Sequence, residues 1–271
     1  MAQPESKGII AFILLDRPEF PDIGPLIEHF GSMLGIDKSV QPVQNPGDKS
    51  TLLVTDKGLV VVALMEFPLP AGYLDLASRA WWWPEAPAAL HKHTAHLVVQ
   101  ASWSGDDRMT AHAKHTLVVR DLIDRLPSAS AVVWGSVIVS TDQYRGEFHR
   151  LQTEGALPVR LWILIQLSGD GNGGTIASTI GMRDFGLMEI EANSAPLSPV
   201  ETLKCVEGLA TYLIAKGPVV NDGDTTGPTT DIRIRVRHAP SFRPDVGTVY
   251  LLDFSLPGEP GTSPVTTVSR N

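Results

Sequence analysis

The amino-acid sequence predicts an α+β protein made of two tandem halves, each a mostly antiparallel sheet covered by helices. Short apolar runs alternate with segments whose apolar residues recur every three or four positions, as strands and amphipathic helices do. The 271 residues are enough for two domains with separate cores. The Gly, Leu, Met and Glu of residues 58–66 also recur at the same relative positions in residues 181–189. We therefore expect two ferredoxin-like halves in the order β-α-β-β-α-β.

The first half is expected to open with a strand at Ile9–Leu15, because this apolar run is continuous but too short for a helix. Two further strands should flank Asp56, Lys57 and Gly58, whose chemistry suits a tight hairpin turn. Asp106 and Asp107 suit the start of a helix that links the halves. The complete expected order for this half is a strand at 9–15, a helix at 23–34, strands at 51–55 and 59–65, a helix at 73–82, a strand at 94–101 and the linking helix, which ends before Pro127.

The second half should repeat this plan. Its clearest element is a helix whose apolar side chains form one stripe and which ends at Gly217 and Pro218. The other expected elements are strands at 131–139 and 159–167, a helix at 142–151, a strand after Thr175, and strands at 232–236 and 248–254.

These elements divide the chain into four parts. Residues 1–7 are expected to be a flexible N-terminus, 8–127 the first half with its linking helix, and 128–256 the second half. Residues 257–271 consist mainly of Pro, Gly, Ser and Thr, so burial offers too little free energy to order them, and we expect a disordered tail.

Composition restricts the classes of function. An apolar fraction of 43% and a charged fraction of 19% are typical of a globular protein with a packed core. With 30 acidic and 22 basic residues the net charge is -8, which argues against nucleic-acid binding through phosphates and favours a basic partner. The single cysteine excludes an intrachain disulfide. Because no signal peptide or membrane span is recognisable, we expect a cytoplasmic protein that is not bound to a membrane.

The tryptophans Trp81, Trp82 and Trp83 are the strongest candidates for a binding surface. Three consecutive indoles on a helix cannot all face one core, so at least one should be exposed. Exposed aromatic side chains are frequent anchors of protein interfaces. The alternative is a wide apolar contact inside the protein.

A histidine-rich region is the candidate metal site. The side chains of His91, His93 and His96 lie close in sequence, with His112 and His115 further along on a predicted helix. Imidazole nitrogen is a common zinc ligand, and a bound ion would activate water for hydrolysis with Glu66 as the base. On a strand, however, His91 and His93 would point away from His96. Histidines that only hydrogen-bond to backbone are the alternative.

Other motifs have simpler interpretations. The run Gly169 to Gly174 matches a dinucleotide-binding spacing, but a β-branched segment follows it, so a hairpin turn is favoured over a phosphate site. The run Asp222 to Gly227 could hold a cation or form an Asx turn. The acids Glu66 and Glu189 are a candidate acid–base pair, with solvated carboxylates as the alternative. Cys205 is expected to be a structural thiol.

Several of these segments occur together in one protein family. Trp83-Pro84 ahead of His93 and His96, the run Phe185 to Glu189, and the run Asp222 to Gly227 ahead of Arg235, Arg237 and His238 resemble the bacterial family of the domain of unknown function DUF4261. The resemblance is expected to span most of the chain, with the family's domain in the C-terminal part. It implies an association with toxin–immunity or secretion genes, and it assigns no functional residue.

No catalytic motif stands beside these features. The sequence therefore predicts a non-enzymatic protein-binding module without a cofactor, either an immunity-type protein or a regulator of a toxin or secretion system. Its expected partner is a basic toxin or a secretion-system component. A zinc-dependent hydrolase that uses His91, His93 and His96 is the alternative.

Overall fold

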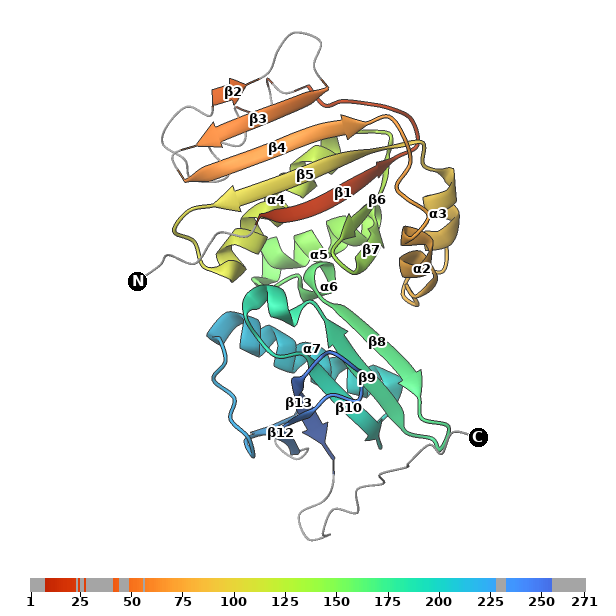
Figure 1. The fold of residues 1–271 in the computed structure, drawn as a ribbon, viewed down its shortest axis with the longest axis vertical. Coiled ribbons are helices and arrows are strands. Elements are labelled where there is room, and N and C mark those ends of the chain that lie inside the picture. The colour runs from red at the N-terminus through yellow and green to blue at the C-terminus, as the bar shows by residue number, and fades with distance from the viewer. Residues whose placement is uncertain are drawn as a thin grey trace. The chain divides into compact units, whose positions relative to one another are not determined.

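A computed structural model describes residues 8–22, 24, 27, 41–43, 49–55, 57–227 and 233–254 (Figure 1). They form two compact units. Unit 1 contains Met1–Leu164 and Ile180–Leu187, and unit 2 contains Ile165–Thr179 and Met188–Asn271. This division differs from the boundary expected after residue 127. The reason is that the segment after residue 127 adds strands to the first sheet and does not begin a second one.

Unit 1 contains a seven-stranded sheet in the order β2-β3-β4-β5-β1-β6-β7, in which all neighbouring strands are antiparallel. The predicted strands of the first half are confirmed within a few residues. The expected strand at 131–139 is instead a hairpin that turns at Gly135, whose φ of 57° suits glycine. The strands are β1 Ile9–Leu15, β2 Gln41–Val43, β3 Ser50–Thr55, β4 Gly58–Met65, β5 Ala95–Trp103, β6 Ala129–Trp134 and β7 Val137–Ser140.

The helices of unit 1 lie on both faces of this sheet. In Figure 1, α4 and α5 lie behind the sheet, and α2 and α3 lie at the end where β4 leaves it. Asp107 caps α4 by accepting a hydrogen bond from the Thr110 amide, as its position in the sequence predicted. The elements are α2 Tyr73–Ser78, α3 Ala86–Lys92, α4 Arg108–Arg125, α5 Thr141–Glu154, α6 Val159–Trp162 and the 3-10 helix η1 Met182–Phe185.

The α+β class is confirmed, but the strand order differs from the expected ferredoxin-like plan. That plan requires a helix that returns the chain along the whole strand, so that two parallel strands are separated by another. Here α2 and α3 have only six and seven residues, and the chain re-enters the sheet where it left, since Met65 pairs with His96. Consequently β5 is the antiparallel neighbour of β4 and separates it from β1.

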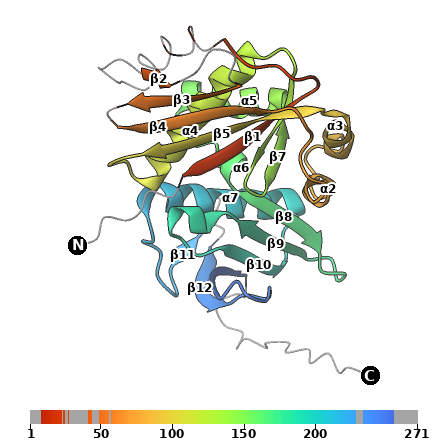
Figure 2. The same cartoon turned by 45° about the horizontal axis from the view of Figure 1, so that its top comes forward.

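Unit 2 contains a six-stranded sheet in the order β11-β12-β13-β10-β9-β8, and β10 and β13 run parallel. Figure 2 shows α7 along the sheet of β8, β9 and β10. Gly217 ends α7 with a φ of 80°, as predicted. The elements are β8 Leu164–Gly169, β9 Thr175–Ile180, β10 Ile190–Ala195, α7 Pro199–Lys216, β11 Thr225–Thr226, β12 Ile234–Pro240 and β13 Thr248–Asp253.

The residues shared by the segments 58–66 and 181–189 do not mark a repeated structural element. Residues 58–65 form strand β4, whereas the matching segment contains the 3-10 helix Met182–Phe185. Gly181 and Gly186 both have positive φ values and bound this helix, so the glycines of the second copy serve turns. Residues 159–162, expected to begin a strand, form α6 instead.

Several expectations lie outside the described residues, namely the helix at 23–34 for the most part, the N-terminus 1–7 and the tail 257–271. Among the described helices, none has the length and apolar character needed to cross a membrane.

Candidate binding surface

The side chains of the unit 1 sheet alternate between two faces. On the face towards α4, Val60, Val62 and Val99 are completely buried. The opposite face of the sheet is turned towards the viewer in Figure 1. It is partly uncovered over β3, β4, β5 and the start of β1. We call this region the open sheet face. It consists of Ile10, Leu52, Val54, Leu59, Val61, Ala63, Val98, Gln100 and Ser102, all half-buried or exposed.

The open sheet face is apolar and carries no charged side chain. Ile10, Val54 and Leu59 are 43%, 41% and 36% exposed, and Phe67, which follows β4, is 57% exposed. Four strands spaced about 4.8 Å apart and about 20 Å long give this face an area of the order of 300–400 Å². The largest apolar patch on a typical monomer has about this size and is often functional.

The three tryptophans divide between the core and the surface. Trp82 and Trp83 pack on a core that includes Leu14, Ala131 and Ile138, and the Trp82 indole donates a hydrogen bond of 3.0 Å to the Ile138 carbonyl. This contact fixes α2 and α3 over β1, β6 and β7. Trp81 is 49% exposed and makes an edge contact with Trp82. The tryptophans therefore cover one part of the sheet and leave the open sheet face beside it.

His91, His93 and His96 do not converge on one point. His91 is exposed. The His93 Nδ1–H donates to the Leu90 carbonyl at 2.5 Å, and its Nε2 accepts from the Leu69 amide at 2.7 Å, so both ring nitrogens are already used. The His96 Nδ1–H donates to the Phe67 carbonyl at 2.9 Å. Burial lowers the pKa of His93 and of His96, and for His93 this favours the neutral ring that an accepting Nε2 requires.

His112 and His115 lie within an aromatic cluster of unit 1. The His112 ring stacks on Trp134 and contacts Phe185, and its Nδ1–H donates to the Arg108 carbonyl at 2.8 Å. His115 is completely buried, and neither of its ring nitrogens has a hydrogen-bond partner among the described residues. Desolvation, followed by the charge of His112, lowers the pKa of His115 to about 3.

Within the described ranges, no three His, Cys, Asp or Glu side chains are arranged to hold one metal ion. The candidate base Glu66 forms a surface ion pair of 2.5 Å with Lys49. Glu189 belongs to unit 2, is buried, and accepts a hydrogen bond of 2.7 Å from the Thr179 hydroxyl. The geometry therefore gives no support to the hydrolase interpretation.

The two glycine-rich motifs of unit 2 form turns. The Asp170 carboxylate accepts hydrogen bonds from the Asn172 and Gly174 amides at 2.7 and 2.8 Å, which closes the hairpin between β8 and β9. Asp222 accepts from the His238 amide at 2.8 Å, and Asp224 accepts from the Asn221 amide at 2.7 Å. The hairpin interpretation of residues 169–174 is confirmed. Residues 222 and 223 form a turn, but within the described residues neither Asp222 nor Asp224 accepts from the amide two residues ahead, so the expected Asx turn is not observed. Cys205 is buried, and burial raises the pKa of its thiol, which favours the unreactive protonated form.

Unit 2 also contains a buried ion pair that the sequence analysis did not identify. The Glu191 side chain is fully buried and accepts hydrogen bonds from Ser241 Oγ at 2.5 Å, the Phe242 amide at 3.1 Å and Arg243 Nε at 3.0 Å. Arg243 also donates from Nη2 to the Thr179 carbonyl at 2.9 Å. These bonds fix the loop between β12 and β13 against β9 and β10.

Comparison with known proteins gives one finding. Residues 178–251 match the family described as a domain of unknown function (DUF4261). The resemblance inferred from the sequence is confirmed, over a shorter range than expected. Neither the curated proteins nor the solved structures gave a match to the chain. The matched range holds most of unit 2, whereas the open sheet face belongs to unit 1.

The residues of the open sheet face were missed because they resemble core residues in sequence. Residues 59–65 are apolar at every position, which is the pattern of a strand buried on both faces. The useful signal was the shortness of the helical segments nearby. Two helices of six and seven residues cannot cover a sheet of seven strands.

Proposed function

We propose that the protein is a protein-binding module that recognises a basic partner through the open sheet face. The single observation that supports this most is the exposure of Ile10, Val54 and Leu59 on an uncharged sheet face beside Phe67. Apolar contacts with few charges at their centre are typical of the core of a protein interface.

The net charge of the chain and the apolar character of the open sheet face indicate the chemistry of the partner. The net charge of -8 attracts a basic protein at long range and speeds association, while the apolar face supplies the short-range contact. A second copy of this chain is less favoured because it carries the same charge.

The resemblance to DUF4261 supports a narrower proposal. We infer a bacterial, cytoplasmic setting in which the module acts as an immunity-type protein against a basic toxin or as a regulator of a secretion system. It acts by occupying a surface of its partner, without catalysis and without a cofactor.

The test is site-specific photo-crosslinking in cells. A photoreactive amino acid is placed at Val61, in the centre of the open sheet face, or at Tyr212, which is 50% exposed on α7 and serves as the control. The proposal expects one basic protein crosslinked at position 61 and absent at 212, which binds the intact module after purification. Production of the module should then protect cells from that protein if it is a toxin.

Two results would contradict the proposal. A crosslink of position 61 to a second copy of the chain would show a dimer interface. Equal crosslinking from positions 61 and 212 would show that the open sheet face has no preference for a partner.

A further inference from the structure

A row of arginines lies along β12 and at the residue before it. Residues 233–243 contain four arginines and no carboxylate, in a chain whose net charge is -8. Arg233, Arg235 and Arg237 occupy alternate positions and are exposed, whereas Ile234 and Val236 between them are buried. Alternate residues of a strand share one face, so the three guanidinium groups follow each other about 7 Å apart.

Within the part of the chain that the structure describes, this row is poorly neutralised. Arg233 and Arg235 have no ion-pair partner there, and Arg237 approaches Asp253 only at 3.8 Å. Arg243 does not contribute to the row, because buried Glu191 holds its guanidinium. Like charges at this spacing repel one another, and the Arg237–Asp253 ion pair offsets only part of this cost.

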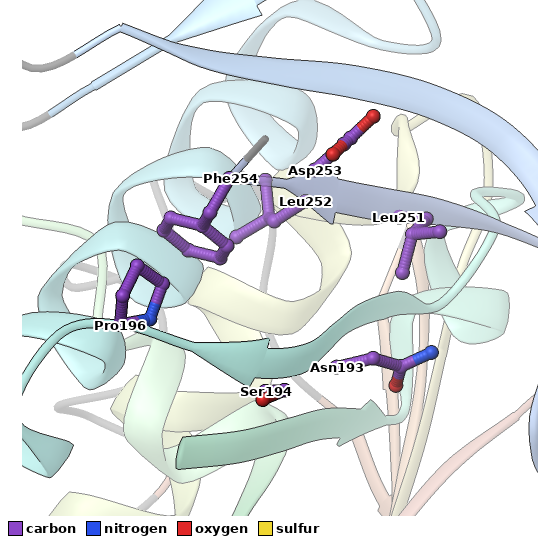
Figure 3. Close-up of a pocket in the computed structure, with 7 residues that line it drawn as sticks. All are labelled: Asn193, Ser194, Pro196, Leu251, Leu252, Asp253 and Phe254. Atoms are coloured by element: carbon purple, nitrogen blue, oxygen red, sulfur yellow. The ribbon is translucent and has the colours of Figure 1, made fainter. Parts of the chain in front are cut away.

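The row borders an open pocket of about 280 Å³. The register of the sheet places Arg235 opposite Asp253 and Arg237 opposite Leu251, and both of these β13 residues line the pocket. Figure 3 shows Pro196, Leu252 and Phe254 grouped on one side of it and Asn193 and Leu251 on the other, with Asp253 directed away from the apolar group. Leu251 and Asp253 thus lie on the same face of the sheet as the arginines, whereas Leu252, opposite buried Val236, lies on the other face.

We propose that the arginine row binds an extended acidic peptide segment that presents carboxylates at alternate positions. Such a segment spaces its carboxylates by about 7 Å, which matches the arginines, and arginine pairs with carboxylates through two parallel hydrogen bonds. This site is independent of the open sheet face.

A peptide is favoured over single-stranded nucleic acid for two reasons. Binding of single strands relies on aromatic side chains that stack with the bases, and no aromatic residue alternates with Arg233, Arg235 and Arg237 on this face of β12. The Asp253 carboxylate beside the row also repels a continuous phosphate backbone, whereas a peptide can place a neutral residue there.

The experiment measures binding of two synthetic peptides to the intact chain by fluorescence anisotropy. One peptide has three glutamates alternating with two valines, and the control has the same composition with its glutamates adjacent. In an extended conformation, only the first peptide presents three carboxylates on one side. We expect the alternating peptide to bind at least twofold more tightly.

Variants separate the row from general electrostatics. Arg235→Gln and Arg237→Gln should each weaken binding about two- to fivefold, the range of exposed ion pairs. Arg150→Gln removes the same charge from α5 and should leave affinity unchanged. Equal affinity for both peptides, an equal loss in Arg150→Gln, no binding at millimolar peptide, or tighter binding of a single-stranded oligonucleotide of equal charge would overturn the proposal.

Discussion

The two sheets of this protein use polar chemistry in opposite ways. In unit 1 the open sheet face bears no charge, and its exposed residues are Ile10, Val54 and Leu59. In unit 2 the face that carries Glu191 bears a buried ion pair and a row of arginines. Burial alone would require neither arrangement, since each sheet already has one mainly apolar, buried face. In each unit, therefore, the face opposite the buried one carries side chains that folding does not require.

The neighbouring residues Val61 and Val62 test that distinction most strongly. Val62 is completely buried, so Val62→Asp should lower the free energy of unfolding by about 4 kcal/mol or more, because a carboxylate would have to be buried without a partner. Val61→Asp, on the open sheet face, should cost about 1 kcal/mol. Urea unfolding followed by tryptophan fluorescence measures both. Similar losses in the two variants would mean that the open sheet face is covered.

The buried ion pair of unit 2 should show the next largest effect. Glu191→Ala leaves the Arg243 guanidinium without its acceptor, and we expect a loss of about 3 kcal/mol. Glu201→Ala removes an exposed acid from the capping box of α7 and should cost about 1 kcal/mol. Urea midpoints decide the comparison, and a Glu191 variant no weaker than the Glu201 variant would show that the pair does not hold the loop.

Trp82 and Trp81 should also differ in their contribution to stability. Trp82→Ala removes core packing and the hydrogen bond to Ile138, for a loss of about 2–3 kcal/mol. Trp81→Ala should cost less than about 1 kcal/mol, because half of that side chain is exposed. Thermal unfolding of the two variants checks this. A greater loss at Trp81 would contradict the assignment of Trp82 as the residue that fixes α2 and α3.

Acid should destabilise unit 1 through His115. Its folded-state pKa of about 3 lies below the unfolded value of about 6.5, so the unfolded chain binds the proton more tightly. The stability is fully present above pH 6.5 and is lost progressively as the pH falls towards 3, by about 2 kcal/mol at pH 5. His115→Phe should flatten this dependence while His93, His96 and His112 remain. An unchanged slope between pH 7 and 5 would locate the acid sensitivity elsewhere.

The sequence predicted elements well where the signal is local. The Asp107 cap and the Gly217 end of α7 were both correct, because capping depends on residues within one turn. Strand order was not predictable. It depends on where the chain leaves the sheet at Met65 and re-enters it at Ala95, and not on the residue pattern of either strand. The similarity between residues 58–66 and 181–189 was misleading, because the shared residues form a strand in the first segment and turns in the second.

The candidate sites were predictable only in part. The hairpin at Asp170 was predicted correctly because its carboxylate bonds to an amide two residues ahead, whereas Asp222 bonds to His238 on a neighbouring segment, which the sequence does not indicate. The open sheet face escaped because an exposed valine such as Val54 has the same pattern as a buried one. Whether Leu59 is covered depends on the lengths of α2 and α3. The helix expected over residues 73–82 ends at Ser78, and α3 at Ala86–Lys92 was not predicted.

The most direct measurement of the central claim is the affinity of Val61→Asp for the protein that crosslinks at position 61. The account predicts at least a tenfold loss of affinity, because a carboxylate in the centre of an apolar interface is buried without a partner. Tyr212→Asp, which adds the same charge on α7, should bind as the unaltered protein does. Full affinity in Val61→Asp, with its fold intact, would contradict the assignment of the open sheet face as the binding surface.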